Sequence, residues 1–216
     1  PGDTYANRMP DPVLQQVEHF SNPGMTANDS FKPVTKYFDR ITRPEQIIQS
    51  LPQAIQTMLD PADTGPACLS LCQDVQGEIF DYPEEFFKER IHNIRRPKPD
   101  DFQIKQAMEK IKKSKKPIII SGGGVFYSDA MDELGSFAIK HNIPVTQTVM
   151  GYSTMKRDHS HFLGPIGGLG GRAANNLAKE TDLAICVGTK LADFTTGSWA
   201  NFENPEFKLV SINIAR

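Results

Sequence analysis

The chain has 216 residues and a formal net charge of -2 at pH 7, and 38% of its residues are hydrophobic. This length suits one large or two modest domains, and the composition is that of an ordinary globular protein, which excludes disordered and fibrous classes. The balance of acidic and basic residues gives no electrostatic case for nucleic acid, and no apolar run has the length of a membrane span or of a secretory signal. We therefore expect a cytoplasmic protein that binds neither nucleic acid nor a membrane.

The cysteines and histidines indicate neither a disulfide nor a metal site. Cys68, Cys72 and Cys186 are odd in number, and on a strand the first two would lie about 13 Å apart, too far for a disulfide. His159 and His161 form a pair, but no third ligand stands at the spacing of a metal motif. We expect reduced core cysteines, a surface loop at the histidines and no metal site.

The first half of the chain shows alternation of helices and strands. Asp11 and Pro12 are typical of a helix start. Residues 37–41 are predicted as a small strand and residues 66–72 as a longer one. The chain then leaves this unit between residues 74 and 83, and the order of elements indicates an α/β domain.

One amphipathic helix is predicted between those two strands. The string Thr42-Arg43-Pro44-Glu45 is a capping box with proline in the first turn. Apolar residues then recur at helical spacing as far as Leu59. Pro52 is expected to kink or interrupt this helix, because proline removes a hydrogen bond from a helix interior.

Residues 90–100 are rich in arginine and proline and have no apolar periodicity, which is typical of an interdomain linker. The sequence therefore predicts the C-terminal part of one domain at residues 1–85, a linker at 86–100 and a second domain at 101–216.

The second domain is organised around a strand and a glycine turn. Three isoleucines at residues 118–120 are β-branched and too few for a helix, which predicts a strand buried on both faces of a parallel sheet. Gly122, Gly123 and Gly124 follow. They form either a tight strand-to-helix turn or a turn that contacts a ligand. The strict dinucleotide fingerprint fails, because Tyr127 stands where its last glycine belongs.

The strand-and-helix pattern then repeats, which predicts an α/β fold with a doubly wound parallel sheet. Residues 168–173 have the spacing Gly-x-Gly-x-x-Ala, but they follow a Pro/Gly-rich stretch, 162–167, that we interpret as a loop; we treat the match as accidental. The expected helices and strands are a helix from residue 104, a helix at about 129–141 that starts at Ser128 and Asp129, a strand at 144–148, a helix at 172–180 and strands at 183–187 and 208–214.

Ligands of such sheets bind beyond the carboxyl ends of the strands, so the loops at residues 122–124, 148–151 and 188–196 are expected to converge on one crevice. No catalytic set is predicted, because Ser121 and Ser128 have no recognisable histidine partner and no acid pairs with the aspartate at the third loop. The candidate cofactor-binding residues are Gly122, Gly123, Gly124, Gly188 and Asp193.

Recognisable strings occur in both halves of the chain. In the first half they are Phe31-Lys32-Pro33-Val34-Thr35-Lys36, Arg43-Pro44-Glu45, Gly65-Pro66-Ala67-Cys68-Leu69 and Gln73-Asp74-Val75-Gln76. In the second half they are Pro117-Ile118-Ile119-Ile120-Ser121-Gly122-Gly123-Gly124, Ile143-Pro144-Val145, Leu163-Gly164-Pro165-Ile166-Gly167 and Val187-Gly188-Thr189. These strings resemble the end of the pyrimidine-binding domain and the central domain of thiamin diphosphate enzymes, in the branch of acetolactate synthase and pyruvate oxidase.

Four further strings make the resemblance within that branch more specific. They are Pro1-Gly2-Asp3, Asp11-Pro12-Val13-Leu14-Gln15-Gln16, Asp60-Pro61-Ala62-Asp63-Thr64-Gly65 and Asp193-Phe194-Thr195-Thr196-Gly197-Ser198. They resemble hydrolases of this family that open a cyclic 1,2-dione to a 5-deoxyglucuronate in inositol catabolism. The resemblance implies thiamin diphosphate as an electron sink, magnesium, a cyclic dione substrate and a homodimer or homotetramer.

The resemblance also implies that the catalytic parts lie elsewhere. The family's cofactor-activating glutamate precedes the stretch that matches Pro1, and its diphosphate and magnesium motif follows the stretch that matches Arg216. We therefore expect a fragment that is inactive alone, without catalytic or metal-binding residues of its own. The remaining alternatives are a nucleotide- or flavin-binding module, a non-catalytic scaffold domain and a fragment of an acetolactate synthase-like carboligase.

The flavin-containing relatives imply one cofactor that we do not expect here. In acetolactate synthases the loop matching Pro165 and Ile166 carries Met-His, and the loop that matches Lys190 and Ala192 carries Arg and Asp. Lysine offers a point charge where arginine offers a planar fork for a diphosphate, and alanine cannot accept a hydrogen bond from a hydroxyl. We expect no FAD.

Overall fold

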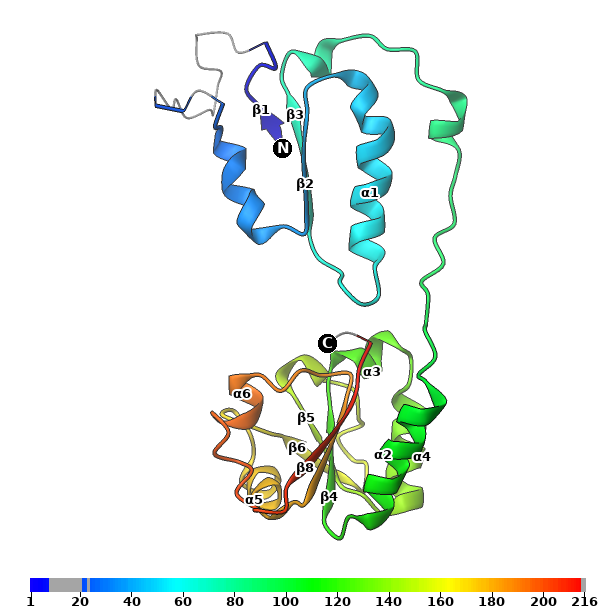
Figure 1. The fold of residues 1–216 in the computed structure, drawn as a ribbon, viewed down its shortest axis with the longest axis vertical. Helices are drawn as coiled ribbons and strands as arrows, with labels where there is room; N and C mark the ends of the chain where they lie inside the picture. The colour runs from blue at the N-terminus through cyan, green and yellow to red at the C-terminus, as the bar shows by residue number, and fades with distance from the viewer. Residues whose placement is uncertain (8–20, 23, 215–216) are drawn as a thin grey trace. The chain divides into compact units, whose positions relative to one another are not determined.

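The structure is a computed structural model that describes residues 1–7, 21–22 and 24–214. The chain forms two compact units, Pro1–Arg95 and Arg96–Arg216 (Figure 1). Residues 89–100, which include the boundary between the two units, are exposed and form neither helix nor strand. The helix predicted after Asp11 lies outside the described residues. No helix in the described part of the chain is long and apolar enough to cross a membrane.

The first unit is built on a three-stranded parallel sheet with the order β1-β3-β2. Its strands are β1 (Gly2–Asp3), β2 (Tyr37–Ile41) and β3 (Ala67–Cys72), so both strands predicted here are confirmed. Helix α1 (Ile47–Leu59) packs on one side of β2 and β3 (Figure 1). The apolar core of this unit is small and centres on Ile41, Cys72 and Val75.

The start of α1 differs from the predicted capping box. A short 3-10 helix, η2 (Pro44–Gln46), precedes it, and Gln46 Oε1 accepts hydrogen bonds from the backbone N–H groups of Thr42 at 2.7 Å and Arg43 at 3.2 Å. Of the two outcomes predicted at Pro52, an interruption is wrong, because α1 runs through it, and a kink stays a prediction. Proline removes a single backbone hydrogen bond, and the packing of α1 on the sheet offsets that loss.

A polar network lies on the other side of this sheet, where the 3-10 helix η1 (Ala27–Val34) packs. Arg40 Nε lies 2.7 Å from Asp3 Oδ2, and a second nitrogen of Arg40 lies 3.0 Å from Asp29 Oδ2. Ser70 donates to Asp3 and accepts from Asn28 Nδ2 at 2.8 Å. The network joins all three strands to η1 through paired, charge-assisted hydrogen bonds.

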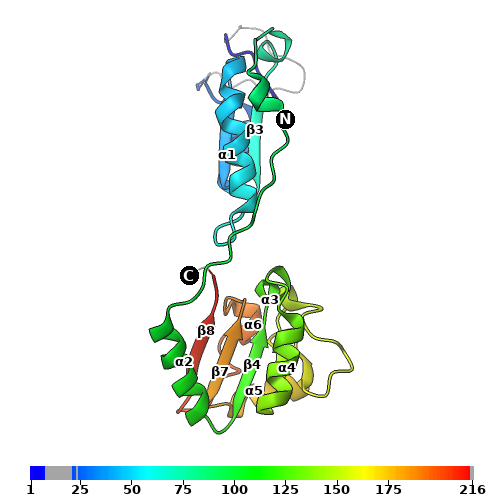
Figure 2. The same cartoon turned by 90° about the vertical axis from the view of Figure 1, so that its right-hand side faces the viewer.

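The second unit is the doubly wound parallel α/β sheet that the sequence predicts (Figure 2). Its strand order is β6-β5-β4-β7-β8, so the chain starts in the centre, moves to one edge, returns and then builds the other edge. The strands are β4 (Pro117–Ser121), β5 (Val145–Gln147), β6 (Phe162–Pro165), β7 (Leu183–Val187) and β8 (Lys208–Ile212).

Helices cover both faces of this sheet. α2 (Asp101–Lys113) and α4 (Met131–His141) lie on one side, and α5 (Arg172–Glu180) and α6 (Asp193–Thr196) lie on the other (Figure 1). In β4, Ile119 packs into the cluster on the α4 side, whereas Ile118 and Ile120 pack with Ala174 and Ala178 of α5. The prediction of a central strand buried on both faces is confirmed.

Two predictions for the second unit are wrong. Residues 162–167 are not only a loop, because β6 begins at Phe162 and pairs with β5. β6 is an edge strand, where Gly164 and Pro165 are tolerated. The helix predicted at about 129–141 is confirmed as α4, but its predicted start at Ser128 and Asp129 is wrong. A separate short helix, α3 (Gly123–Tyr127), starts inside the glycine turn, and Asp129, with φ of 54°, separates it from α4.

Candidate functional site

The predicted site lies at the carboxyl ends of β4 and β7, the central strands from which the chain leaves toward opposite edges of the sheet. Gly122, Gly124 and Gly188 come together here. A Cβ added to Gly124 would lie 2.5 Å from Gly188 Cα, and one added to Gly122 would lie 2.4 Å from the Gly188 carbonyl oxygen. Gly188 also has a φ of 61°. The two loops are thus in backbone-to-backbone contact, closer than any side chain allows.

Backbone hydrogen bonds use the amides of this turn internally. The N–H of Gly122 donates to the carbonyl of Val187 at 2.9 Å, and that of Gly124 donates to the carbonyl of Gly188 at 2.9 Å. A phosphate-binding turn needs free amides directed at the ligand. The geometry of these two glycines is therefore that of a structural strand-to-helix turn.

Gly123 faces the loop after β5. A Cβ added to it would lie 2.9 Å from the Met150 carbonyl oxygen, and one added to Gly151 would lie 2.3 Å from the Ser121 carbonyl oxygen. The short 3-10 helix η5 (Val149–Gly151) is thereby held against the glycine turn. The loop at residues 148–151 does converge on the turn, as the sequence predicts.

Buried hydroxyls fix this convergence, and the sequence reasoning missed them. The Oγ of Ser121 lies 2.7 Å from Thr154 Oγ1, and Thr154 donates to the Gly151 carbonyl at 2.7 Å. Thr148 Oγ1 accepts from the N–H of Gly151 at 3.0 Å. Ser121 is fully buried and bonded, so it is a structural group and not a nucleophile. The signal available in the sequence was a serine at the end of one strand, Ser121, together with two threonines, Thr148 and Thr154, in the segment after the next strand.

Asp193 takes no part in the contact between the glycine loops and bonds within its own short helix. It is the first residue of α6, and its carboxylate accepts a hydrogen bond from Ser198 Oγ at 2.7 Å. The N–H of Ser198 also donates to the Asp193 carbonyl at 3.1 Å. This aspartate therefore stabilises its own turn, which ends at Gly197 with φ of 57°.

The glycine-rich motif at residues 168–173 follows the strand β6 and leads into α5. It therefore has the strand-to-helix context that a dinucleotide fingerprint requires and that the sequence did not predict. Its amides are nevertheless used internally. Gly168 donates to the Phe194 carbonyl at 2.8 Å, and Gly171 donates to the Pro165 carbonyl at 2.9 Å. Asn175, which the sequence reasoning also missed, accepts from the N–H of Gly167 at 2.9 Å and donates to its carbonyl at 3.0 Å.

The described residues offer no reactive thiol. Cys68, Cys72 and Cys186 are free and buried, as predicted. Burial raises the pKa of Cys186 to about 12, and burial together with the charge of Asp3 raises the pKa of Cys72 to about 11. Thiols with such pKa values stay protonated at neutral pH and are poor nucleophiles.

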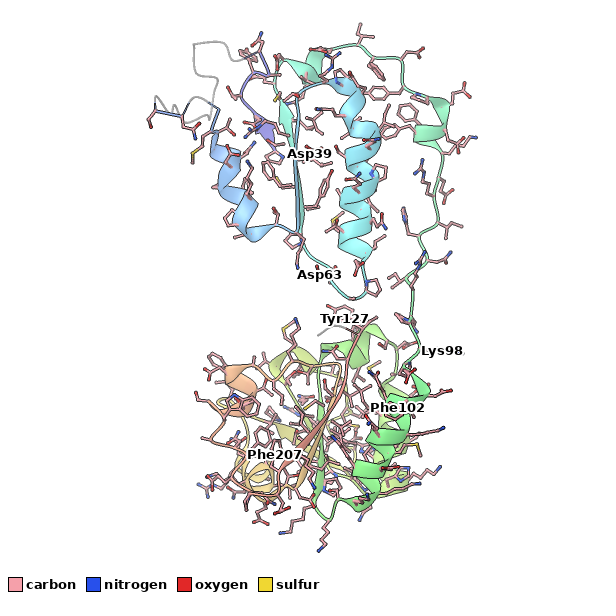
Figure 3. The ribbon with its side chains drawn as sticks, viewed as in Figure 1. Asp39, Asp63, Lys98, Phe102, Tyr127 and Phe207 are labelled. Carbon is pink, nitrogen blue, oxygen red and sulfur yellow. The ribbon has the colours of Figure 1, made fainter. Side chains whose placement is uncertain are left out.

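The histidines and acids of the described residues form no group of three that could hold a metal ion. His161 Nε2 lies 3.0 Å from Asn142 Oδ1, and His161 and His159 stand in an irregular segment before β6. The candidate site therefore offers a rigid backbone junction and exposed apolar side chains beside it. One of these is Tyr127, which is 78% exposed and projects from the end of α3 (Figure 3).

Comparison with known proteins gives a consistent result for the whole chain. Proteins named 3D-(3,5/4)-trihydroxycyclohexane-1,2-dione hydrolase are similar to it throughout: the one from Clostridium perfringens strain 13 is 50% identical over 216 residues. The one from Clostridium tetani is 49% identical over 215 residues, and the one from Shouchella clausii is 45% identical over 216 residues. These alignments cover 100% of this chain and 33% or 34% of the relatives, so the chain spans about a third of their length.

A family model described as "Thiamine pyrophosphate enzyme, central domain" matches residues 104–216, which is most of the second unit. Thiamine pyrophosphate is another name for thiamin diphosphate. The parallel sheet with helices on both faces agrees with that description. The chain therefore belongs to the family of thiamine pyrophosphate enzymes, and its second unit corresponds to the central domain of that family.

Proposed function

We propose that this chain is part of a thiamin diphosphate-dependent hydrolase that opens the ring of trihydroxycyclohexane-1,2-dione to a 5-deoxyglucuronate in inositol catabolism. The observation that carries the proposal is the 50% identity, along the entire chain, to relatives named for that substrate. Membership of the thiamine pyrophosphate family supports it, because the cofactor supplies an electron sink for cleavage of a carbon–carbon bond.

The described residues do not fit the cofactor's diphosphate and metal. The amides of Gly122 and Gly124 are used within the sheet, and the described part of the chain has no cluster of three potential metal ligands. We propose that thiamin diphosphate and magnesium bind outside these 216 residues. In this proposal the second unit has a structural role. Its buried hydroxyls and glycines fix the loops at the carboxyl ends of the central strands.

We propose further that this central domain binds no FAD. The internal use of the glycine amides supports this, as do Lys190 and Ala192 at the positions where flavin-containing relatives carry Arg and Asp. Purified protein is expected to be colourless. A stoichiometric flavin absorption band that persists through gel filtration would contradict this prediction.

The proposed assembly is a cytoplasmic homodimer or homotetramer. Three free cysteines support a reducing compartment. Exposed apolar side chains follow the carboxyl ends of β4 and β5, among them Phe126, Tyr127 and Met150. They support contact with other protein surfaces. Light scattering of the protein after gel filtration measures the assembly, and a monomer at micromolar concentration would rule it out.

The activity itself is tested with the complete protein that contains this chain. Incubation with thiamin diphosphate, magnesium and trihydroxycyclohexane-1,2-dione should consume the dione and release one equivalent of acid. Omission of thiamin diphosphate after dialysis should abolish the reaction. A parallel incubation with pyruvate distinguishes the carboligase alternative: formation of acetolactate without dione cleavage would overturn the proposal.

A further inference from the structure

A cavity of 830 Å³ opens beside the carboxyl ends of β5 and β6 in the second unit. Its lining comes from these two edge-side strands and from the segment between them. Gly122, Gly124 and Gly188 do not line it, so the cavity is separate from the glycine junction. Its lining includes Gln147, Met155, Lys156, Arg157 and Phe162.

Gln147, the last residue of β5, carries an unpaired side-chain oxygen and lines this cavity. The residue is 7% exposed, and its Oε1 has no hydrogen-bond partner among the described residues. Its neighbours differ: Thr146 Oγ1 donates to the Ile119 carbonyl at 3.1 Å, and Thr148 Oγ1 accepts from Gly151. Buried side-chain polar atoms are normally paired, so an unpaired one beside a cavity indicates a missing donor.

The charge at this cavity is of one sign. Lys156 and Arg157 line it, no aspartate or glutamate does, and neither cation forms an ion pair within the described ranges of the chain. Asp158 follows Arg157 in sequence but is not part of the lining. Met155 and Phe162 add apolar surface. The cavity thus combines two cations, one buried acceptor and an apolar wall.

We propose that this cavity binds a small hydroxylated carboxylate. The carboxylate pairs with Lys156 and with the guanidinium fork of Arg157, and a hydroxyl donates to Gln147 Oε1. The carbon skeleton packs on Phe162. Binding here is independent of the proposed ring-opening reaction, because the cavity contains no catalytic set.

The test is calorimetric titration of the complete protein with D-glucuronate, which carries both features, and with D-glucose and acetate, which carry one each. We expect saturable binding of D-glucuronate and much weaker binding of the other two. A double variant, Lys156→Gln with Arg157→Gln, should weaken D-glucuronate binding about tenfold, because both charge-assisted contacts are lost. Gln147→Met, which keeps the side-chain volume, should weaken it about fivefold through loss of the acceptor.

A matched control is Lys113→Gln with Lys115→Gln, which removes two cations that line a different cavity of the same unit. It should leave the affinity unchanged. Failure of D-glucuronate to saturate, or equal affinity in the Lys156/Arg157 double variant and the parent, would overturn the proposal. The double variant changes exposed side chains, so it stays informative even if Gln147→Met does not fold. Dione cleavage by the same samples reports separately on the proposed function.

Discussion

Gly188 has the most demanding backbone environment at the glycine junction. Its φ of 61° disfavours any residue with a Cβ, and an added Cβ would lie 2.6 Å from Gly124 Cα. Gly124 follows β4 and Gly188 follows β7. These two strands are buried and paired, so separating them to admit a Cβ would cost packing and hydrogen bonds. We therefore expect Gly188→Ala to lower the free energy of unfolding of the second unit by about 3 kcal/mol, measured by urea denaturation.

Gly168 provides the matched control for that substitution. It lies in the same unit, has no positive φ, and a Cβ there would be in ordinary contact, 3.8 Å from Phe194 Cδ1. Gly168→Ala should change the free energy of unfolding by less than about 0.5 kcal/mol. Equal destabilisation by the two substitutions would show that close backbone contact is not what requires glycine at Gly188.

Asp29 should make the first unit sensitive to acid. Burial opposes its ionisation, but hydrogen bonds from Lys32, from the backbone of Thr26 and from Arg40 outweigh it and lower the pKa from 3.8 to about 2. Burial also opposes ionisation of Asp3, and hydrogen bonds again lower its pKa. A lowered folded-state pKa gives stability that is present above the unfolded value and is lost as the pH falls toward the folded value.

The Asp29 contribution is on the order of 2 kcal/mol and should disappear between about pH 4 and pH 2. Urea denaturation of the first unit across this range measures it. Asp29→Asn should be less stable at pH 7 and should show a flatter pH profile. A profile as steep as that of the parent would mean that other carboxylates cause the loss.

The residues of the candidate site could be predicted only where the backbone dictates them. Glycines after an isoleucine strand indicate a turn, and the structure has that turn. Gln147 and Asn175 gave no comparable signal, because an amide in a polar stretch has no spacing rule that distinguishes a surface side chain from one that bonds a buried loop. The fold brings Gly167 and Asn201 to Asn175, and it places Gln147 at a cavity between two paired strands.

At the scale of elements, the strands predicted from continuous apolar runs are those that tertiary structure buries on both faces. β4 and β7 are continuous apolar runs, and such runs predict central parallel strands. β6 was missed because it contains Gly164 and Pro165, which are typical of loops. Only its place at the edge of the sheet makes proline compatible with a strand, and that place is not readable from local sequence.

The strands of the two units should differ in their resistance to opening. β4 has a partner strand on each side and lies between two apolar clusters, whereas β2 is an edge strand of the small three-stranded sheet. Amides of β4 should therefore exchange with deuterium more slowly than those of β2, by at least about tenfold. Hydrogen exchange followed by mass spectrometry measures both; equal protection would imply that the first unit is stabilised by contacts beyond its own core.

At the scale of the whole molecule, the segment between the two units should be the first to be cut by protease. Residues 89–100 are exposed and form no regular hydrogen-bonded structure. Trypsin should cleave after Arg90 and Arg95, but not after Arg96 or Lys98, because proline follows both. Mass spectrometry of a brief digest should find a product that begins at residue 91 or 96 and then persists.

The control for this digest is a variant with Arg90→Gln and Arg95→Gln, which should survive several times longer under the same conditions. Early cuts within α2 or α4, while residues 89–100 are still intact, would contradict the prediction that this segment is cleaved first. Persistence of the C-terminal product would also show that the second unit keeps its fold without the first.

The contact between Gly122, Gly124 and Gly188 involves main-chain atoms alone. Substitutions at exposed positions beside these glycines can therefore change the chemistry at the carboxyl ends of β4 and β7 without moving the backbone contact. Lys190 and Ala192, which the sequence resemblance leads us to expect in place of an Arg and an Asp of acetolactate synthases, follow Gly188 closely, and the turn at Gly188 is intact. Because the contact itself is made by main-chain atoms, exposed positions beside it can change over evolution while the backbone architecture is inherited.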